Sequence, residues 1–367
     1  MDRQDLIQLL TDAMLGRVDD GMFGAKVREG QVKSRLIEAH PPEASPDGAE
    51  SLLAGVAEGA GARCERLSDD LWAIVGNEDI FFVDALNPRF WLLHSTARAH
   101  TVGSLLRKHV VSSPQLDSAW FSADHLRQLE GERRWIRSSF SSDELQPREA
   151  GVVVPRRWRV QVEGDTPEEL LELVSANEKY RSSASLTAVG AILRDEKLGN
   201  AEVAADYQGS FVSHGSSFEV VVGLLWRALD RYETYVLGLE DRFQLRTETV
   251  ASDTLSNDSA ALGLKEEGDV AYIEFPHRVA DLETFVVNLF NCKEPFRLWA
   301  VPREVTSGYW EANAVDLHVG HSLRLEITPD WLRVLLGEHT CGNTLARLIA
   351  NFQHRFDAQT QLAAAGV

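Results

Sequence analysis

Three short apolar segments joined by tight turns constrain the fold of this chain more than any other feature. They lie at residues 71–75, 80–83 and 90–93, and Asn87-Pro88 introduces the third. Neighbouring strands connected by so few residues run antiparallel, because a parallel crossover needs a dozen or more residues. Helical patterns alternate with strands elsewhere in the chain. The sequence therefore predicts an α+β fold in which antiparallel sheets are backed by helices.

Polar stretches predict where the 367 residues divide into two or three lobes. Residues 247–269 are rich in Ser, Asp, Asn and Gly, a composition typical of a flexible linker. A second polar stretch ends at Pro155. Cutting at both places predicts three parts: an N-terminal α+β lobe at 1–145, a middle β-α-β-β-α lobe at 156–246, and a C-terminal α+β lobe at 269–360 with a hairpin and a final amphipathic helix.

A heptad pattern predicts one long helix over residues 216–245 of the middle lobe. Its apolar seam consists of Phe218, Val222, Leu225, Leu229, Tyr232, Val236 and Leu239. The seam could bind a partner or a second copy of the chain, or it could pack against the sheet of its own lobe. Gly223 and Gly238 each weaken an isolated helix by about 1 kcal/mol relative to alanine. The glycines favour packing within the chain, where tertiary contacts support the helix.

Charge and composition restrict the partners that the chain can have. The formal charge is −19, from 56 acidic and 37 basic residues. Such a field repels nucleic acid and anionic membranes, so we expect a protein partner or self-association. No apolar run is long enough to span a membrane. Three cysteines cannot form a disulfide framework, and the acidic N-terminus does not resemble a secretory signal, so we expect a cytoplasmic protein.

One local cluster of basic residues runs against this overall charge. Arg156, Arg157 and Arg159 surround a tryptophan at the start of the middle lobe. Such a cluster could contact the phosphates of a nucleic acid or a nucleotide. The simpler interpretation, which we favour, is a solvated linker or strand edge.

The residues around Cys341 form the best candidate for a chemical site. The cysteine lies just before the last predicted helix, where backbone dipoles favour a thiolate. His339 or His318 could act as the base, and Asp316 could orient an imidazole, because Asp316 and His318 share one face of a strand. This constellation predicts a cysteine-dependent hydrolase or acyl transferase. The alternative is a small buried cysteine beside an ordinary turn.

The same residues could in principle bind a metal ion. His318, His321, His339 and Cys341 are ligand types that zinc accepts. No paired cysteine motif accompanies them, so the sequence does not identify a metal site. It also contains no motif that indicates a cofactor.

Local patterns near the C-terminus predict three elements around this site. Val319-Gly320 predicts a two-residue hairpin turn. Residues 328–330 predict the cap of a short helix that ends at Gly337. The last helix, capped by Asn343 or Thr340, presents one apolar face.

Taken together, the patterns favour a non-catalytic cytoplasmic protein. It would bind another protein or its own copy through residues 216–245 and the lobe surfaces. An enzyme centred on Cys341 and a nucleic-acid or nucleotide binder using residues 156–159 are the alternatives. The sequence does not decide whether the chain is an enzyme.

Overall fold

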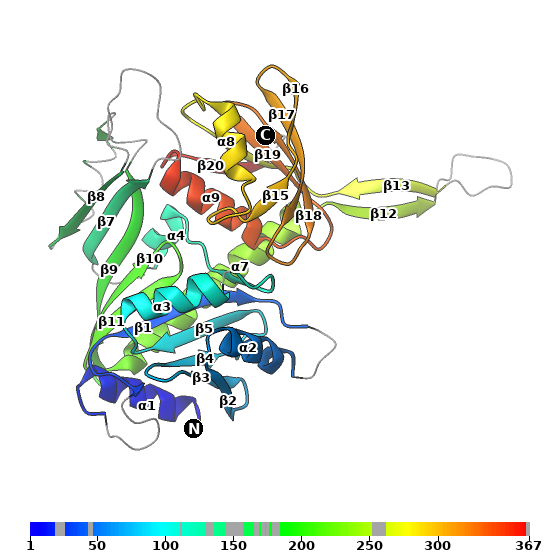
Figure 1. The fold of residues 1–367 in the computed structure, drawn as a ribbon. Helices are drawn as coiled ribbons and strands as arrows, with labels where there is room; N and C mark the ends of the chain where they lie inside the picture. Colours follow the sequence, from blue (N-terminus) through cyan, green and yellow to red (C-terminus); the bar gives the residue numbers. More distant parts are fainter. Residues whose placement is uncertain are drawn as a thin grey trace. The chain divides into compact units, whose positions relative to one another are not determined.

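The computed structural model of the chain describes residues 1–18, 26–42, 47–110, 112–129, 135–143, 157–164, 169, 173, 176–177, 184–251 and 262–364. These residues form a mixed α+β fold with antiparallel sheets, which confirms the predicted class (Figure 1). The chain divides into two compact units. Unit 1 comprises Met1–Ser142 and Arg157–Glu233, and unit 2 comprises Asp143–Arg156 and Thr234–Val367.

The division into units differs from the three predicted lobes. The strands of the predicted N-terminal and middle lobes hydrogen-bond in one sheet, through the antiparallel pair β1 (Val32–Ala39) and β11 (Ser210–Gly215). The polar stretch before Pro155 predicts a boundary between two lobes, but the strands before and after it are neighbours in the same sheet. The boundary of unit 1 instead falls inside the long helix, between Glu233 and Thr234.

Unit 1 is built on an 11-stranded sheet with the order β2-β3-β4-β5-β1-β11-β10-β9-β7-β8, and β6 pairs with β1 beside this path. The remaining strands of this sheet are β2 (Arg63–Ser68), β3 (Leu71–Val75), β4 (Ile80–Asp84), β5 (Phe90–Ser95), β6 (Leu116–Ser118), β7 (Trp135–Asp143), β8 (Arg157–Glu163), β9 (Ser185–Asp195) and β10 (Gly199–Asp206). Strands β3, β4 and β5 are the predicted antiparallel meander.

Helices cover both faces of the meander, which explains its continuous apolar sequence. Every residue of β3, β4 and β5 is buried. On one face, the helices α2 (Gly48–Gly59) and α3 (Ala99–Leu105) pack their apolar side chains on the strands. On the other face, α1 (Arg3–Met14) contacts β1, and the Phe218 and Tyr232 rings contact His94 and Phe90. The short elements η2 (Leu106–Val110) and α4 (Ala123–Gln128) complete unit 1.

The heptad pattern correctly predicts one helix, α7 (Phe218–Phe243). Its seam is buried, with Leu225, Leu229, Tyr232 and Val236 all fully enclosed. Val222 is half-buried. The seam therefore packs within the chain, as its two glycines suggest. Among the described helices, α7 included, none is long and apolar enough to cross a membrane.

Unit 2 contains a seven-stranded sheet with the order β15-β17-β18-β19-β14-β20, and β16 also pairs with β17. Its strands are β14 (Ala271–Glu274), β15 (Leu298–Ala300), β16 (Arg303–Thr306), β17 (Tyr309–Asp316), β18 (Ser322–Ile327), β19 (Trp331–Leu336) and β20 (Gln361–Ala364). Helices α8 (Leu282–Leu289) and α9 (Asn343–Arg355) lie on one face, where Phe285 and Phe352 stack at 5.7 Å.

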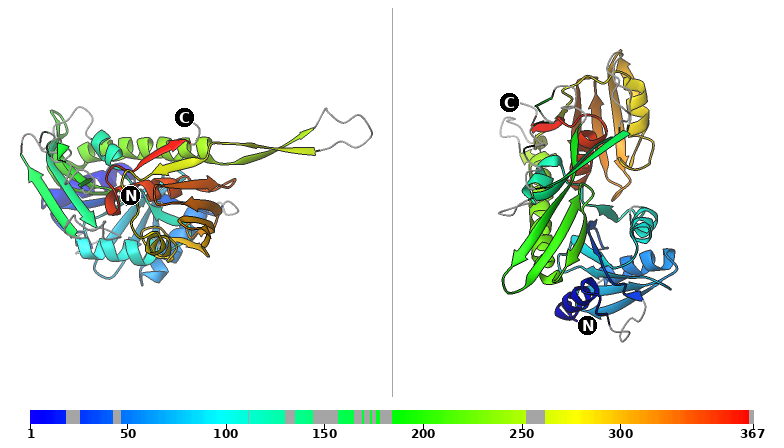
Figure 2. Two further views of the ribbon diagram at one scale, coloured as in Figure 1. Left: turned by 90° about the horizontal axis from the view of Figure 1, so that it is seen from above. Right: turned by 90° about the vertical axis from the view of Figure 1, so that its left-hand side faces the viewer.

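Two predicted elements of unit 2 are wrong. Residues 331–336 form strand β19, because Leu332, Val334 and Leu336 alternate toward the core and the backbone pairs with β18 and β14. The predicted linker at 247–269 contains an antiparallel ribbon of β12 (Arg246–Ala251) and β13 (Leu262–Glu267). Figure 2 shows this ribbon extending away from the seven-stranded sheet. Residues 252–261 lie outside the described part.

Candidate functional site

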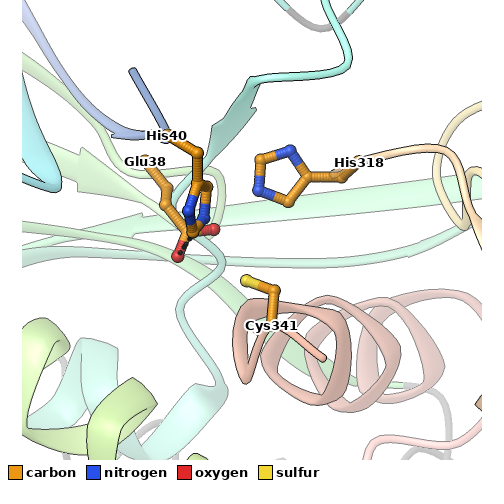
Figure 3. A group of neighbouring side chains, drawn as sticks. All are labelled: Glu38, His40, His318 and Cys341. Atoms are coloured by element: carbon orange, nitrogen blue, oxygen red, sulfur yellow. Dashed lines mark ion pairs between the residues drawn. The ribbon is translucent and has the colours of Figure 1, made fainter. Parts of the chain in front are cut away.

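The structure brings Cys341 and His318 together in unit 2. Their ligating atoms lie within 4.8 Å of each other (Figure 3). His318 follows strand β17, and Cys341 immediately precedes Gly342, the N-cap of α9. Both side chains are buried, with 4% of Cys341 and none of His318 exposed. The catalytic roles predicted for these two residues stay predictions, and the burial of Cys341 agrees with the alternative interpretation of a small buried cysteine.

Asp316 makes a buried polar network that links strand β17 to helix α9. Its carboxylate accepts hydrogen bonds from the Arg347 guanidinium at 2.6 Å, from the Thr344 hydroxyl, and from the His318 backbone N–H at 2.9 Å. Arg347 is fully buried and Asp316 is 1% exposed. These bonds give the carboxylate a structural role. Its predicted role, to orient a catalytic imidazole, stays a prediction.

The N-terminus of helix α9, which was predicted to stabilise a thiolate at Cys341, already binds a carboxylate of the protein. Gly342 is the N-cap, and neither Asn343 nor Thr340 caps the helix as predicted. The Gly342 N–H donates to the Glu240 carboxylate at 2.7 Å. This negative charge occupies the position that an oxyanion would need, and it disfavours a second anion at Cys341.

The other two histidines of the predicted cluster lie in different surroundings. The His339 side chain is 81% exposed and lies 3.9 Å from Glu338. His321 is half-buried, and its carbonyl accepts the Asp316 N–H at 2.9 Å, which closes the hairpin. The hairpin loop consists of the four residues 317–320, so the predicted two-residue turn is wrong, although Val319 and Gly320 both have a positive φ. His318 is therefore the hairpin histidine that borders the thiol.

Unit 1 contains a buried acid, Glu38 on strand β1, and the half-buried His40 follows the same strand. The His40 Nε2 atom lies 3.4 Å from the Glu38 carboxylate, which Figure 3 marks with a dashed line. Arg89 donates to the same oxygen at 2.6 and 2.7 Å. Glu38 is fully buried, so its charge depends on these partners. Each pair alone offers two ligands, and a zinc ion takes four.

The predicted basic cluster is only partly described. Arg157 and Arg159 lie on strand β8, Arg159 is exposed, and Arg156 lies outside the described residues. The nucleic-acid interpretation of this cluster stays a prediction.

The face of the seven-stranded sheet opposite α8 and α9 is open to solvent, and we call it the outer face. Three of its ring residues gather on neighbouring strands: Trp331 lies 5.6 Å from Tyr272 and 6.4 Å from Tyr309. Charged side chains lie beside them on the same strands: Glu274, Arg303, Glu311, Arg324, Glu326 and Arg333. Trp299 of β15 projects from this face and is 49% exposed.

Comparison with known proteins places the chain in one family. The model of the MJECL33-like protein family matches residues 1–366. The chain belongs to the MJECL33-like family. It is 24% identical over 329 residues to the uncharacterised protein MJECL33 of Methanocaldococcus jannaschii, which covers 78% of this chain and 77% of the relative. The family match spans both units, so the two belong to one MJECL33-like architecture.

Sequence reasoning missed two features of this MJECL33-like chain that carry charge or rings. Glu38 lies between Ile37 and Ala39 in the apolar second half of strand β1, and an acid at such a position is a signal of a buried partner. The outer face is visible as strict alternation, since Arg324 and Glu326 alternate with Leu323, Leu325 and Ile327.

Proposed function

We propose that the chain is a self-associating assembly protein that binds a second copy of itself through the outer face. The observation that carries this proposal is an open, aromatic sheet face in a strongly acidic protein. Trp299, Tyr309, Trp331 and Tyr272 lie on it, and aromatic residues and arginine are enriched where proteins bind each other.

The distribution of charge supports a second copy as the partner. The chain carries a formal charge of −19, so two copies repel each other over most of their surfaces. On the outer face the strands present three arginines and three glutamates, which balance. A charge-balanced face is where two such chains can approach with the smallest repulsion.

The arrangement of these charges also suits a symmetric contact. Glu326 lies between Arg333 at 3.0 Å and Arg324 at 3.4 Å, so opposite charges alternate across the strands. In a twofold dimer the same surface meets itself, and an alternating pattern can be complementary to its own copy. The edge of this sheet adds exposed apolar side chains, Val301 at 78% and Val305 at 44%.

Sedimentation velocity over a range of micromolar concentrations tests the proposal. The wild-type chain should sediment as a dimer, and Trp299→Glu should weaken dimerisation by roughly tenfold or more, because a charge would replace an exposed ring of the outer face. Leu198→Glu is the matched control, since Leu198 is similarly exposed at 41% but lies in unit 1. A wild-type monomer at every concentration, or equal effects of both variants, would refute this function.

A second candidate function is thiol chemistry at Cys341, which the short distance to His318 favours. A nucleophilic role requires that the thiol reacts despite its burial. Iodoacetamide at neutral pH, followed by peptide mass spectrometry, measures this directly. Cys292 is exposed and provides an internal reference in the same sample. Modification of Cys341 ahead of Cys292 would support the enzyme, and protection of Cys341 until unfolding would exclude it.

A further inference from the structure

Two neighbouring hollows open on the α2 side of unit 1, and one histidine borders both. The larger has a volume of about 400 Å³ and is lined by residues of helix α2 and by His109, Ser112, Ser113 and Gln115. The smaller, of about 190 Å³, lies beside the turn between β3 and β4. His109 lines each of them. The larger hollow falls within the size range of small-molecule sites in proteins.

The backbone around His109 is unusual. The residue belongs to η2, a single turn of π-helix, and π-helical turns are rare and occur frequently at functional sites. The imidazole lies against the backbone of α2, since a Cβ atom on Gly59 would lie only 3.0 Å from His109 Nδ1. Glycine at this position therefore allows the imidazole to line the hollows.

The larger hollow combines an apolar floor with neutral polar walls. Leu52 and Val56 are 8% and 5% exposed and form part of the floor. The polar side chains that line it are Ser51, His109, Ser112, Ser113 and Gln115. Each of them can take part in hydrogen bonds without carrying a fixed charge. None of its described lining residues is Lys, Arg, Asp or Glu, which suits an uncharged ligand.

Gly55 is one of the residues that line the larger hollow, and it has no side chain to fill it. No atom lies within 4 Å of the position where its Cβ would stand. A planar ring can therefore approach the helix backbone and contact Leu52 and Val56. Its edges would face the hydroxyl, amide and imidazole groups of the walls. A nucleobase has this combination of a flat apolar face and polar edges.

The smaller hollow offers hydrogen-bond acceptors beside the same imidazole. Glu78 and Asp79 line it together with Thr101 and Ser104. Arg28 pairs with both carboxylates, at 3.8 Å from Glu78 and 3.0 Å from Asp79, so the rim keeps an excess of negative charge. Hydroxyl groups of a sugar can donate to these carboxylates, whereas a phosphate would be repelled.

We propose that unit 1 binds a nucleoside, with the base against Gly55 in the larger hollow and the ribose hydroxyls toward Glu78 and Asp79. His109 stands at the junction and can hydrogen-bond to either part. This site lies in unit 1, so it is independent of the outer face of unit 2 and of the proposed self-association.

Isothermal titration calorimetry of the full chain with adenosine, guanosine, cytidine and uridine tests this proposal. At least one nucleoside should bind, and its 5′-monophosphate should bind several-fold more weakly because of the carboxylates. Gly55→Leu should weaken binding by roughly tenfold or more, since its side chain would occupy the open hollow. His109→Ala should also weaken it.

Gly238→Leu is the matched control, because Gly238 also lies in a helix, α7, with open space around its Cβ position. Both glycine variants gain similar helix propensity, so the midpoint temperature of thermal unfolding should rise in both. Loss of binding in Gly55→Leu alone supports the site. The proposal is overturned if no nucleoside binds at millimolar concentration, if the monophosphates bind more tightly, if simple sugars bind as well as nucleosides, or if both glycine variants bind like the wild type.

Discussion

The two large sheets of this protein are built from opposite sequence patterns. In unit 1, strands β3, β4 and β5 are buried along their whole length. In unit 2, strands β18 and β19 alternate between buried and accessible residues. A strand covered by helices on both faces reads as a continuous apolar run, and a strand with one solvated face alternates. The difference indicates that unit 1 encloses its meander, whereas unit 2 presents a surface.

This contrast also separates the kinds of site that each unit can contain. Unit 1 has hollows at its helical surface, where α2 and His109 meet. Unit 2 has an extended face with rings and paired charges, together with a buried polar network under α9. A hollow suits a small molecule, and a broad face suits a macromolecule. The following predictions test how far the contrast holds.

The largest expected effect comes from adjacent residues of strand β4. Phe81→Ala and Phe82→Ala should each lower the free energy of unfolding by about 3–5 kcal/mol, because each opens a cavity. The side chains point to opposite faces and are 5% and 0% exposed. Urea denaturation measures both. A cost below about 1 kcal/mol for either would mean that its face of the meander is not packed in solution.

Breaking the buried ion pair of unit 2 should cost nearly as much. Arg347→Met leaves the Asp316 carboxylate buried without its guanidinium, which costs about 3–5 kcal/mol. The double variant Asp316→Asn with Arg347→Met removes both charges and should recover part of this loss. Native-state hydrogen exchange locates the effect in α9 and β17. Equal stability of the single and double variants would contradict the charge argument.

The two sheets were predictable from sequence to different extents. The meander was evident because tight turns fix antiparallel neighbours, and α7 was evident from its spacing. Pro329 and Gly337 resemble helix boundaries and predict a helix over 331–336, whereas the buried and accessible residues of this segment alternate as in a strand. Local patterns report spacing along the chain, and they do not report which strands pair across it. Hence the joining of β1 to β11 was not predictable.

The candidate site shows the same limit. Cys341, His318 and Asp316 were chosen from residue type and proximity in sequence. Their distances and partners depend on tertiary contacts from α7 and α9. Nothing near residue 341 signals that Glu240, about a hundred residues earlier, caps the next backbone N–H. Nothing near residue 316 signals that Arg347 needs its carboxylate.

The stability of unit 1 should decrease at low pH because of its buried histidine, His94. Burial lowers the pKa of His94 to about 4, while the nearby Asp84 charge opposes the shift. The unfolded chain binds this proton near pH 6.5, so the stabilisation is complete above that pH and is lost as pH falls toward 4. The loss should reach about 3 kcal/mol at pH 4. Urea denaturation of His94→Gln between pH 4 and 7 should show a free energy of unfolding that changes less with pH than that of the wild type.

Ser34→Ala is the control for this histidine. The Ser34 hydroxyl lies 2.9 Å from His94 Nδ1, and its removal should cost about 1–2 kcal/mol at every pH. The free energy of unfolding of this variant should still decrease as the pH falls, as in the wild type, because the His94 imidazole is still buried and neutral. The same slope in wild type and His94→Gln would show that other groups carry the acid sensitivity of unit 1.

The smallest effect is expected on the outer face of unit 2. Arg324→Ala should change the free energy of unfolding by less than about 1 kcal/mol in dilute solution, because its pairs with Glu311 and Glu326 are solvated. Leu325→Ala, one residue along β18, should cost about 2–5 kcal/mol. If copies associate through this face, the cost of Arg324→Ala should increase with protein concentration, because association stabilises the folded chain by mass action. A large cost at the lowest concentration would instead mean that the face is covered within the monomer.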